Sequence, residues 1–281
     1  MPEAAPEIGL TVMRGALRVL SRTAPRIATR VAADLFMKPR KFRTPPREKA
    51  LLAGAESLTI RAGETTIQAW RWGSGPVAIL AHGWEGRGSQ MASFVEPLVA
   101  AGRTVIAFDA PGHGRSDGNR SSLPHFAWAL RSVAAAVADN APDAIIAHSL
   151  GCAATTLALR EGLSAGRLVF ISPPLEPTDY ASRFGDILGL EAGIIDAMRL
   201  KIEERFLRKW TDFSLGEAAR TMTSPLLVIH DRDDQDTLWS EGAALADAWP
   251  GARMMSTEGL GHRRILRDPA VIEAASKFVT E

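Results

Sequence analysis

Residues 145–151 read IIAHSLG, an apolar run that ends in a histidine, a serine, a leucine and a glycine. The run predicts a buried strand, and the LGCAATTLALREGL stretch that begins at its leucine predicts a helix. A serine on a tight turn between a strand and a helix needs small residues two positions before and after it, because the turn brings those positions close to neighbouring backbone. Ala147 and Gly151 meet this need. The turn would expose the hydroxyl of Ser149 above a sheet; the alternative is a serine that only caps the helix.

The rest of the chain predicts the sheet to which this strand belongs. From about residue 55, strand-like and helix-like segments alternate, which is the pattern of a mainly parallel sheet with helices on both faces. The alternation stops over residues 175–221, which are helix-prone and contain no convincing strand. The sequence therefore predicts an α/β fold with an eight-stranded sheet and an inserted helical segment. The predicted strands are ESLTIR, TTIQAWRW, PVAILAH, RTVIAFDA, AIIAHS, RLVFISPP, PLLVIHD and ARMMSTE.

The N-terminal segment lies outside this alternation and is basic. Residues 1–50 carry eleven Lys and Arg against four Asp and Glu, although the whole chain of 281 residues has a net charge of +1. Arginines recur at every fourth position from Arg14 to Arg30, and they interrupt any apolar stretch long enough for a signal peptide or a membrane span. We expect one or two helices, broken at Pro25, that dock on the main domain with a solvated basic face. A peripheral contact with a membrane or a partner and an organellar transit peptide are the alternatives.

These features give three regions: an N-terminal extension over residues 1–54, a core over 55–174 and 222–281, and an insertion over 175–221. The small net charge gives no case for a nucleic-acid partner. The single cysteine, Cys152, cannot form a disulfide within the chain, so the cytoplasm is the expected location.

A serine hydroxyl becomes a useful nucleophile only beside an imidazole that takes its proton, and that imidazole needs a carboxylate to orient it. Both follow Ser149 along the chain. Residues 230–236, HDRDDQD, contain four aspartates at the end of an apolar strand, and His262 follows the last predicted strand in the loop EGLGHRR. The order serine, acid, histidine is that of one fold with a serine nucleophile. Upstream, HGW at residues 82–84 ends another strand, where a loop could supply a second N–H to an oxyanion.

Over roughly residues 55–281 the sequence resembles the α/β-hydrolase superfamily. The motifs that carry the resemblance lie at strand ends and are HGW, DAPGHGRSD, AHSLG, HDRDD and GLGH. The resemblance implies that Ser149 is the nucleophile, that His262 is the general base and acid, and that the backbone amides of Trp84 and Leu150 form an oxyanion hole. It also implies that the insertion forms a lid over the pocket.

The resemblance also selects the acid. In relatives the strand before the acid usually ends in a glycine that is followed three positions later by the acid, and this count falls on Asp234. Asp231 stands where relatives often have that glycine, and Ala147 is a second departure, since the usual pattern has glycine two positions before the serine. The alternative acids are Asp231, Asp233 and, after the preceding strand, Glu176 or Asp179.

The aspartate cluster does not match a calcium loop, because the sixth position is Asp236 and the twelfth is Gly242. No two histidines have the i, i+4 spacing of a helical zinc site, so we expect no metal and no cofactor. The other three aspartates are expected to cap the helix predicted over TLWSEGAALA and to pair with arginines such as Arg232 or Arg263.

Residues around the serine and the HGW loop are expected to support the site. His82, with Gly83, is expected to hold the oxyanion loop by hydrogen bonds rather than to transfer protons. His148 is expected to point away from the serine along the end of the strand. Glu85 and Arg87 are interpreted as exposed turn charges; the alternative is that they select a polar group of the substrate.

The residue types predict acyl transfer, because relatives that open epoxides or displace halide carry an aspartate where this chain has Ser149. The expected activity is hydrolysis of carboxylic esters with small to medium acyl groups, including thioesters or lactones, through an acyl-enzyme on Ser149. The partner would then be a small-molecule ester. The alternatives are an acyltransferase with the same triad and a member of the fold that binds without catalysis.

Overall fold

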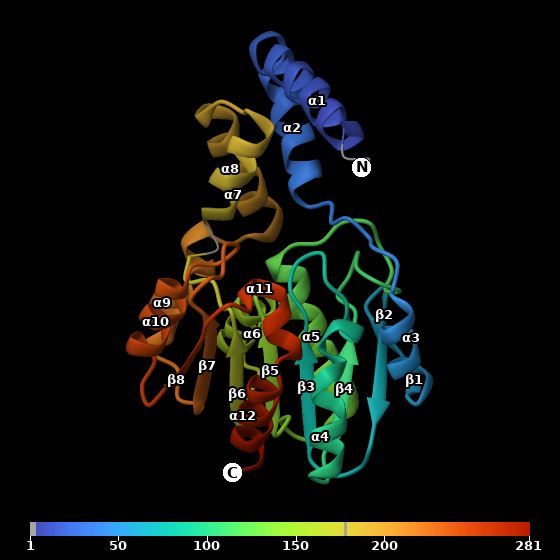
Figure 1. Ribbon diagram of the computed structural model, residues 1–281. Helices are drawn as coiled ribbons and strands as arrows, with labels where there is room; N and C mark the ends of the chain where they lie inside the picture. Colours follow the sequence, from blue (N-terminus) through green and yellow to red (C-terminus); the bar gives the residue numbers. More distant parts are fainter. Residues whose placement is uncertain (1–3, 177–178) are drawn as a thin grey trace. The chain divides into compact units, whose positions relative to one another are not determined.

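The structure, a computed structural model, describes residues 4–176 and 179–281 (Figure 1). Its elements divide into two compact units. The first unit takes the described residues of Met1–Lys38 and Pro177–Phe213, and the second takes Pro39–Glu176 and Ser214–Glu281. This division differs from the regions expected from the sequence, because the N-terminal helices join the inserted segment while the stretch just before the first strand belongs with the sheet.

The second unit is built on an eight-stranded, mostly parallel sheet, as the sequence predicts. The strand order is β1-β2-β4-β3-β5-β6-β7-β8. The first two strands form an antiparallel hairpin, β2 also pairs antiparallel with β4, and all other neighbours pair in parallel. The strands are β1 (Glu56–Ala62), β2 (Thr65–Trp72), β3 (Val77–Ala81), β4 (Thr104–Phe108), β5 (Ala144–His148), β6 (Arg167–Ile171), β7 (Leu226–Asp231) and β8 (Arg253–Thr257).

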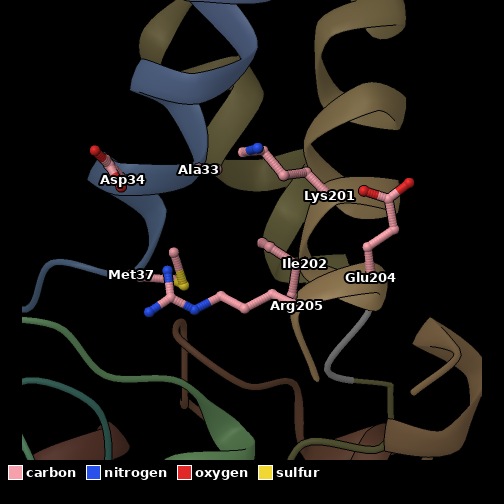
Figure 2. A pocket seen from close by; sticks show the side chains of 7 residues that line it. All are labelled: Ala33, Asp34, Met37, Lys201, Ile202, Glu204 and Arg205. Atoms are coloured by element: carbon pink, nitrogen blue, oxygen red, sulfur yellow. The ribbon is translucent and has the colours of Figure 1, made fainter. Parts of the chain in front are cut away.

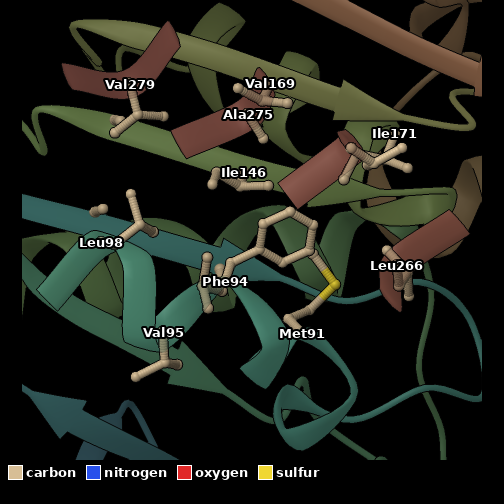
Figure 3. Close-up of a cluster of buried hydrophobic side chains, with 14 of the residues drawn as sticks. Met91, Phe94, Val95, Leu98, Ile146, Val169, Ile171, Leu266, Ala275 and Val279 are labelled. Carbon is tan, nitrogen blue, oxygen red and sulfur yellow. The ribbon is translucent and has the colours of Figure 1, made fainter. Parts of the chain in front are cut away.

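Helices cover both faces of this sheet. They are α3 (Pro46–Ala53), η1 (Gly88–Phe94), α4 (Val95–Ala100), α5 (Leu123–Val137), α6 (Leu150–Arg160), α9 (Leu215–Ala219), α10 (Trp239–Ala248), α11 (Gly261–Arg264), η3 (Ile265–Arg267) and α12 (Pro269–Thr280). On one face, Ile146 of β5 lies in a core cluster with Phe94, Leu98 and Val279 from η1, α4 and α12 (Figure 3). On the other face, α6 contacts β3 and β5. Because both faces are covered, every residue of β4, β5 and β7 is buried, which explains why these strands are mostly apolar.

The first unit is helical and has a core of its own. Its helices are α1 (Ala4–Thr23), α2 (Pro25–Phe36), α7 (Asp179–Leu188), α8 (Ala192–Phe206) and η2 (Trp210–Phe213). Pro25 separates α1 from α2 and occupies the first turn of α2, where no N–H donor is required. Ala28 and Ala32 of α2 pack with Ile195 and Met198 of α8, and the small alanine side chains leave room for the longer ones.

The arginines of α1 contact the inserted segment. Arg14 donates from Nε to the carbonyl oxygen of Ile187 at 2.6 Å, and Arg22 Nε lies 3.5 Å from the carboxylate of Glu191. The basic row therefore ties α1 to the end of α7 and the start of α8. Within the described part of the chain, no helix combines the length and the hydropathy that a membrane span requires.

A cavity of about 330 Å³ lies within the first unit, between α2 and α8 (Figure 2). Its lining carries both signs of charge. The lining residues are Ala33, Asp34, Met37, Lys201, Ile202, Glu204 and Arg205. None of the residues that the sequence singles out for catalysis is among them, so this cavity is not the reaction site that the family resemblance implies.

Candidate active site

Ser149 joins β5 to α6 in a strained backbone conformation. Its φ of 54° and ψ of −124° lie in a region that residues with a side chain rarely adopt. Such strain costs on the order of 1–3 kcal/mol and persists only where the surroundings impose it. The N–H of Ser149 donates to the carbonyl oxygen of Ile171 at 2.9 Å, so the pairing of β5 with β6 continues up to the turn.

Two glycines make room for this turn. A Cβ atom at Gly151 would lie 2.6 Å from the carbonyl oxygen of Ala81 and 2.7 Å from that of His82, so the first turn of α6 rests directly on the end of β3. A Cβ atom at Gly83 would lie 2.9 Å from the Cβ atom of Ser149. The β3 turn and the β5 turn are therefore in contact, and side chains at these two glycine positions would push them apart.

Asp234 and His262 are hydrogen-bonded, with His262 Nδ1 2.8 Å from Asp234 Oδ2. The second carboxylate oxygen accepts the N–H groups of Asp236 and Thr237 at 2.9 and 3.0 Å. Burial alone would raise the pKa of Asp234, but hydrogen bonds from His230 and His262 outweigh burial and hold this pKa well below its usual value. Asp234 is therefore a carboxylate at neutral pH. It accepts the proton on Nδ1 of His262, which leaves Nε2 as the basic nitrogen.

The alternative acids have other partners. Asp233 Oδ2 accepts the N–H of Gly259 at 2.8 Å, Glu176 accepts the hydroxyl of Ser214 at 2.5 Å, and Asp179 begins α7. Asp234 is thus the carboxylate that the structure brings to the histidine. Among residues 4–176 and 179–281, no group of three His, Cys, Asp or Glu side chains is arranged to hold a metal ion.

Asp231 holds the loop that carries His262. Its oxygens accept the N–H groups of Leu260 and Gly261 at 3.1 and 2.8 Å and the hydroxyl of Thr257 at 2.6 Å. Burial would raise the pKa of Asp231, but these hydrogen bonds outweigh burial and keep the pKa below its usual value. A charged carboxylate therefore fixes the two amides that directly precede His262.

The prediction that the extra aspartates cap the next helix or pair with arginines is wrong for Asp231. The helix is α10, which begins after Leu238, and the N–H of Leu238 donates to the side chain of Glu241 at 3.1 Å. Arg232 lies 3.5 Å from Glu258 instead. Capping patterns are local. The N–H of Asp233 does donate to Asp231 locally, but the donors from Leu260 and Gly261 lie about thirty residues further along the chain.

The amides expected in the oxyanion hole lie on the two turns that touch. Leu150 is the first residue of α6, where a helix has no internal acceptor for its N–H and carries partial positive charge. Trp84 lies in the turn after β3, closed by a hydrogen bond from the N–H of Gly86 to the carbonyl oxygen of Gly83 at 3.0 Å. Because Gly83 packs against Ser149, the two turns flank the serine.

Two buried histidines bridge the loops around these turns. His82 Nδ1 donates to the carbonyl oxygen of Gly83 at 2.7 Å, and its Nε2 accepts the N–H of Ala110 at 3.0 Å. His113 Nε2 accepts the N–H of Glu85 at 3.1 Å. Burial lowers the pKa of His82 to about 4 and that of His113 to about 3. Both are neutral at pH 7 and act as hydrogen-bond bridges.

His148 lies against His262. Its Nε2 is 2.8 Å from the carbonyl oxygen of His262, and the two ring centroids are 4.7 Å apart. Burial lowers the pKa of His148 to about 3, so it is neutral and donates this hydrogen bond from Nε2. The expectation that His148 only points away from the serine missed this contact, because the loop after β8 returns to the end of β5.

Glu85 and Arg87 are not exposed turn charges, so that prediction is wrong. Arg87 is buried and donates two hydrogen bonds to Glu48 of α3, at 2.6 and 2.7 Å. Arg40 donates to the carboxylate of Glu85 at 2.8 to 3.0 Å. The partners precede β1, outside the family resemblance, and lie 39 and 45 residues away along the chain.

Thr237 is a residue of the site that the sequence analysis missed. Its hydroxyl lies 3.2 Å from Asp234 Oδ2, 3.3 Å from His262 Nδ1 and 3.3 Å from the carbonyl oxygen of Ser172. The hydroxyl thus fills the space beside the bond between acid and imidazole. The sequence feature that could have identified Thr237 is its position three residues after Asp234, within the same turn.

A family model described as the alpha/beta hydrolase family matches residues 78–275, a span that includes Ser149, Asp234 and His262. The chain belongs to this family. As a member of the alpha/beta hydrolase family, it has the chain order of serine, acid and histidine at the ends of its parallel strands. Among curated proteins, none matches the chain significantly.

Solved structures share this fold over most of their length. An esterase of Pyrococcus furiosus has a TM-score of 0.66 and 19% identity, covering 86% of this chain and 98% of its own. An N-acyl homoserine lactone degrading enzyme has a TM-score of 0.63 and 18% identity, covering 79% and 100%. A thioesterase domain from the curacin biosynthetic pathway has a TM-score of 0.61 and 18% identity, covering 81% and 99%. At these identities the likeness concerns the fold alone.

Replacing Gly151 with alanine should destabilise the protein, because the new methyl group would lie within 2.7 Å of two backbone oxygens. Overpacking of this kind costs about 1–3 kcal/mol. Gly54→Ala is the matched control in the same unit, since Gly54 has a φ of −91° and a methyl group there would meet no atom within 4 Å. Urea unfolding measures both variants, and equal midpoints would contradict the close approach of α6 to β3.

Stability should fall as the pH is lowered from 6.5 to 5. His82, His113 and His148 have folded-state pKa values of about 4, 3 and 3, so below pH 6.5 the unfolded chain binds more protons than the folded one. Each histidine contributes up to about 1.4 kcal/mol per pH unit to this slope. Urea midpoints measured across the range check the sign. His148→Gln, whose amide can still donate to the His262 carbonyl, should make the slope shallower, and an unchanged slope would contradict the assignment.

Proposed function

We propose that this chain is a serine hydrolase that cleaves carboxylic esters through an acyl-enzyme on Ser149. One arrangement carries the proposal: His262 is bound to Asp234 at 2.8 Å, and its backbone is bound at 2.8 Å by His148, the neighbour of a serine in a strained turn. A serine that only caps a helix requires neither a strained conformation nor an acid and base beside it. The catalytic interpretation accounts for both features.

In the proposed reaction, Ser149 Oγ attacks the carbonyl carbon of the ester while Nε2 of His262 takes the hydroxyl proton. The carbonyl π bond opens to an oxyanion, which accepts hydrogen bonds from the amides of Leu150 and Trp84. Asp234 remains a carboxylate and stabilises the imidazolium through Nδ1. His262 then returns its proton to the alcohol oxygen as the carbon–oxygen bond breaks, and the acyl group stays on the serine.

Water completes the cycle with the same groups. Nε2 of His262 takes a proton from water as the water oxygen attacks the acyl carbon, and the second oxyanion forms where the first did. Collapse of this intermediate breaks the bond to Ser149, whose oxygen takes the proton back from His262. The carboxylic acid leaves, and the starting protonation states are restored.

The substrate class is a small molecule with an activated carbonyl and a small to medium acyl group. Enzymes of similar fold include an esterase, a thioesterase domain and an enzyme that degrades an acyl lactone. In all three compound types the carbonyl carbon carries an oxygen or sulfur leaving atom, so one sequence of proton transfers serves them. Thioesters and lactones therefore belong with open-chain esters among the substrates to be tried.

Ser149→Ala should abolish hydrolysis of p-nitrophenyl esters, lowering kcat by at least about 10⁴-fold, because the nucleophile is lost. The assay series runs over increasing acyl length, and its optimum measures the size of the acyl site. Ser172→Ala is the matched control. Ser172 is also buried at a strand end with a φ of 49°, and its hydroxyl has no hydrogen-bond partner among the described residues.

Ser172→Ala should keep the wild-type turnover. Hydrolysis that survives in Ser149→Ala would contradict the acyl-enzyme. Ester products formed with an added alcohol or thiol, in preference to free acid, would reassign the protein as an acyltransferase with the same nucleophile.

The two buried aspartates should differ in their effect on rate. Asp234→Asn removes the carboxylate that fixes the Nδ1 proton of His262, and kcat should fall by about 10³- to 10⁴-fold. Asp231→Asn only loosens the loop before His262, so a smaller loss of about 10- to 100-fold is expected. Asp247→Asn, on the exposed side of α10, is the control with wild-type rate. A larger loss in Asp231→Asn than in Asp234→Asn would reverse the assignment of the acid.

A further inference from the structure

The loop that carries Trp84 has a strained conformation of its own. It runs from the end of β3 to the start of η1, and Glu85 within it has a φ of 56°, in the left-handed region. A residue with a side chain stays in that region only where its surroundings hold it there. The hydrogen bond between Gly86 and Gly83 closes the turn but does not attach it to the rest of the unit. Contacts from outside the loop must therefore fix its position.

One of these contacts is a buried ion pair at the end of the loop, next to Gly88, whose N–H donates to Asp109 at 2.7 Å. Arg87 donates from Nε and Nη2 to the two carboxylate oxygens of Glu48 at 2.6 and 2.7 Å. The hydroxyl of Ser89 donates to the same carboxylate at 2.6 Å. The side chains of Arg87 and Glu48 are 8% and 7% exposed. A bidentate pair of this kind fixes orientation as well as distance, so α3 holds the point where the loop enters η1.

A second contact from the same segment reaches the strained residue. Arg40 donates from its side chain to both carboxylate oxygens of Glu85 and from its backbone N–H to Oε1 at 3.1 Å. On the other side, His113 accepts the N–H of Glu85. The side chain and the amide of Glu85 are therefore both held, and Glu85 is the next residue after Trp84.

We propose that Glu48 and Arg40 are positioning residues that aim the Trp84 amide at the oxyanion. This inference rests on the proposed function and extends it to a segment that precedes the first strand. We call Arg40 and Glu48, with their partners Glu85 and Arg87, the N-terminal clamp. The clamp sets the position of the Trp84 amide, and none of its four side chains has to contact the substrate.

The energetics of buried ion pairs distinguish positioning of the Trp84 amide from a contribution to the stability of the fold. Removing two charges from water offsets most of their attraction, so an apolar pair of similar volume often stabilises a fold equally well. An apolar pair cannot reproduce the two parallel hydrogen bonds between Arg87 and Glu48. A displacement of about 1 Å at a catalytic group can lower a rate about 100-fold. The expected signature is a loss of rate without a loss of stability.

The test replaces the pair in the full chain by Glu48→Leu combined with Arg87→Met. For p-nitrophenyl ester hydrolysis, kcat should fall about 10- to 100-fold while KM changes less than about threefold, because the oxyanion exists only near the transition state. The pH dependence of kcat should keep its midpoints, since the acid and base are unchanged. The control is Arg131→Met with Glu161→Leu, which removes a 3.1 Å ion pair between α5 and the C-terminus of α6 and should leave kcat unchanged.

Amide hydrogen exchange gives a readout that needs no turnover. Exchange over residues 82–90 should be faster in the double variant than in the wild type, and unchanged in the control. A folded double variant with wild-type kcat and wild-type exchange would overturn the proposal. If the wild type hydrolyses no ester, the proposed function fails, whereas faster exchange would still support the clamp.

Glu85→Gly is the alternative test of the clamp if the double variant does not fold. Glycine adopts a φ of 56° without strain, so this change removes the contact with Arg40 while leaving the backbone conformation accessible. We expect kcat to fall about 3- to 10-fold with unchanged KM, because the turn then samples more orientations. A wild-type kcat together with wild-type exchange over residues 82–90 would again overturn the proposal.

Discussion

The strained turn at Ser149 is the constraint on which the arrangement of the second unit depends. It sends α6 back along the sheet from the end of β5, so that the serine hydroxyl and the first amides of the helix lie at the same edge. The helix can start there only because Gly151 allows contact with the carbonyl oxygens of Ala81 and His82. That contact in turn places the β3 loop against the serine. β5 pairs in parallel with β3 on one side and with β6 on the other, and these buried strands hold Ser149 in its strained conformation.

Burial also decides where positive charge can form at this edge. His82, His113 and His148 are held neutral because burial lowers their pKa values to about 4, 3 and 3. A permanent cation in any of these positions would oppose protonation of His262. Asp234, by contrast, stays ionised beneath His262. In the proposed reaction, the charge that develops on His262 therefore meets the carboxylate of Asp234, and none of these three imidazoles carries a charge that would oppose it.

Local sequence patterns predicted the sheet and the serine turn, because strand periodicity and the small residues around Ser149 act over a few positions. The family resemblance selected Asp234 as the predicted acid, through the spacing that relatives have at the end of one strand. The roles of Asp231, Glu48 and Arg87 could not be predicted, since each has a partner about thirty or more residues away along the chain. A charged residue beside a turn is expected to be exposed when no ion-pair partner for it is known, which is why Arg87 was predicted to be exposed. For the same reason the sequence did not predict that the N-terminal helices and most of the insertion, which are distant in sequence, form one unit.

Carboxylates from outside hold both loops of the site, since loops have no strand neighbour to pair with. Asp231 accepts the amides before His262, and Asp109 accepts the N–H groups of Gly88 and Arg115, each at 2.7 Å. Hydrogen bonds to a charged group contribute about 1.5–3 kcal/mol each. The pKa values of these two carboxyl groups shift in opposite directions. At Asp109 burial outweighs the hydrogen bonds and raises the pKa, whereas at Asp231 the hydrogen bonds outweigh burial and lower it. On acidification Asp109 is therefore protonated at a higher pH than Asp231, so the charge that holds the Gly88 amide is lost before the charge that holds the two amides preceding His262.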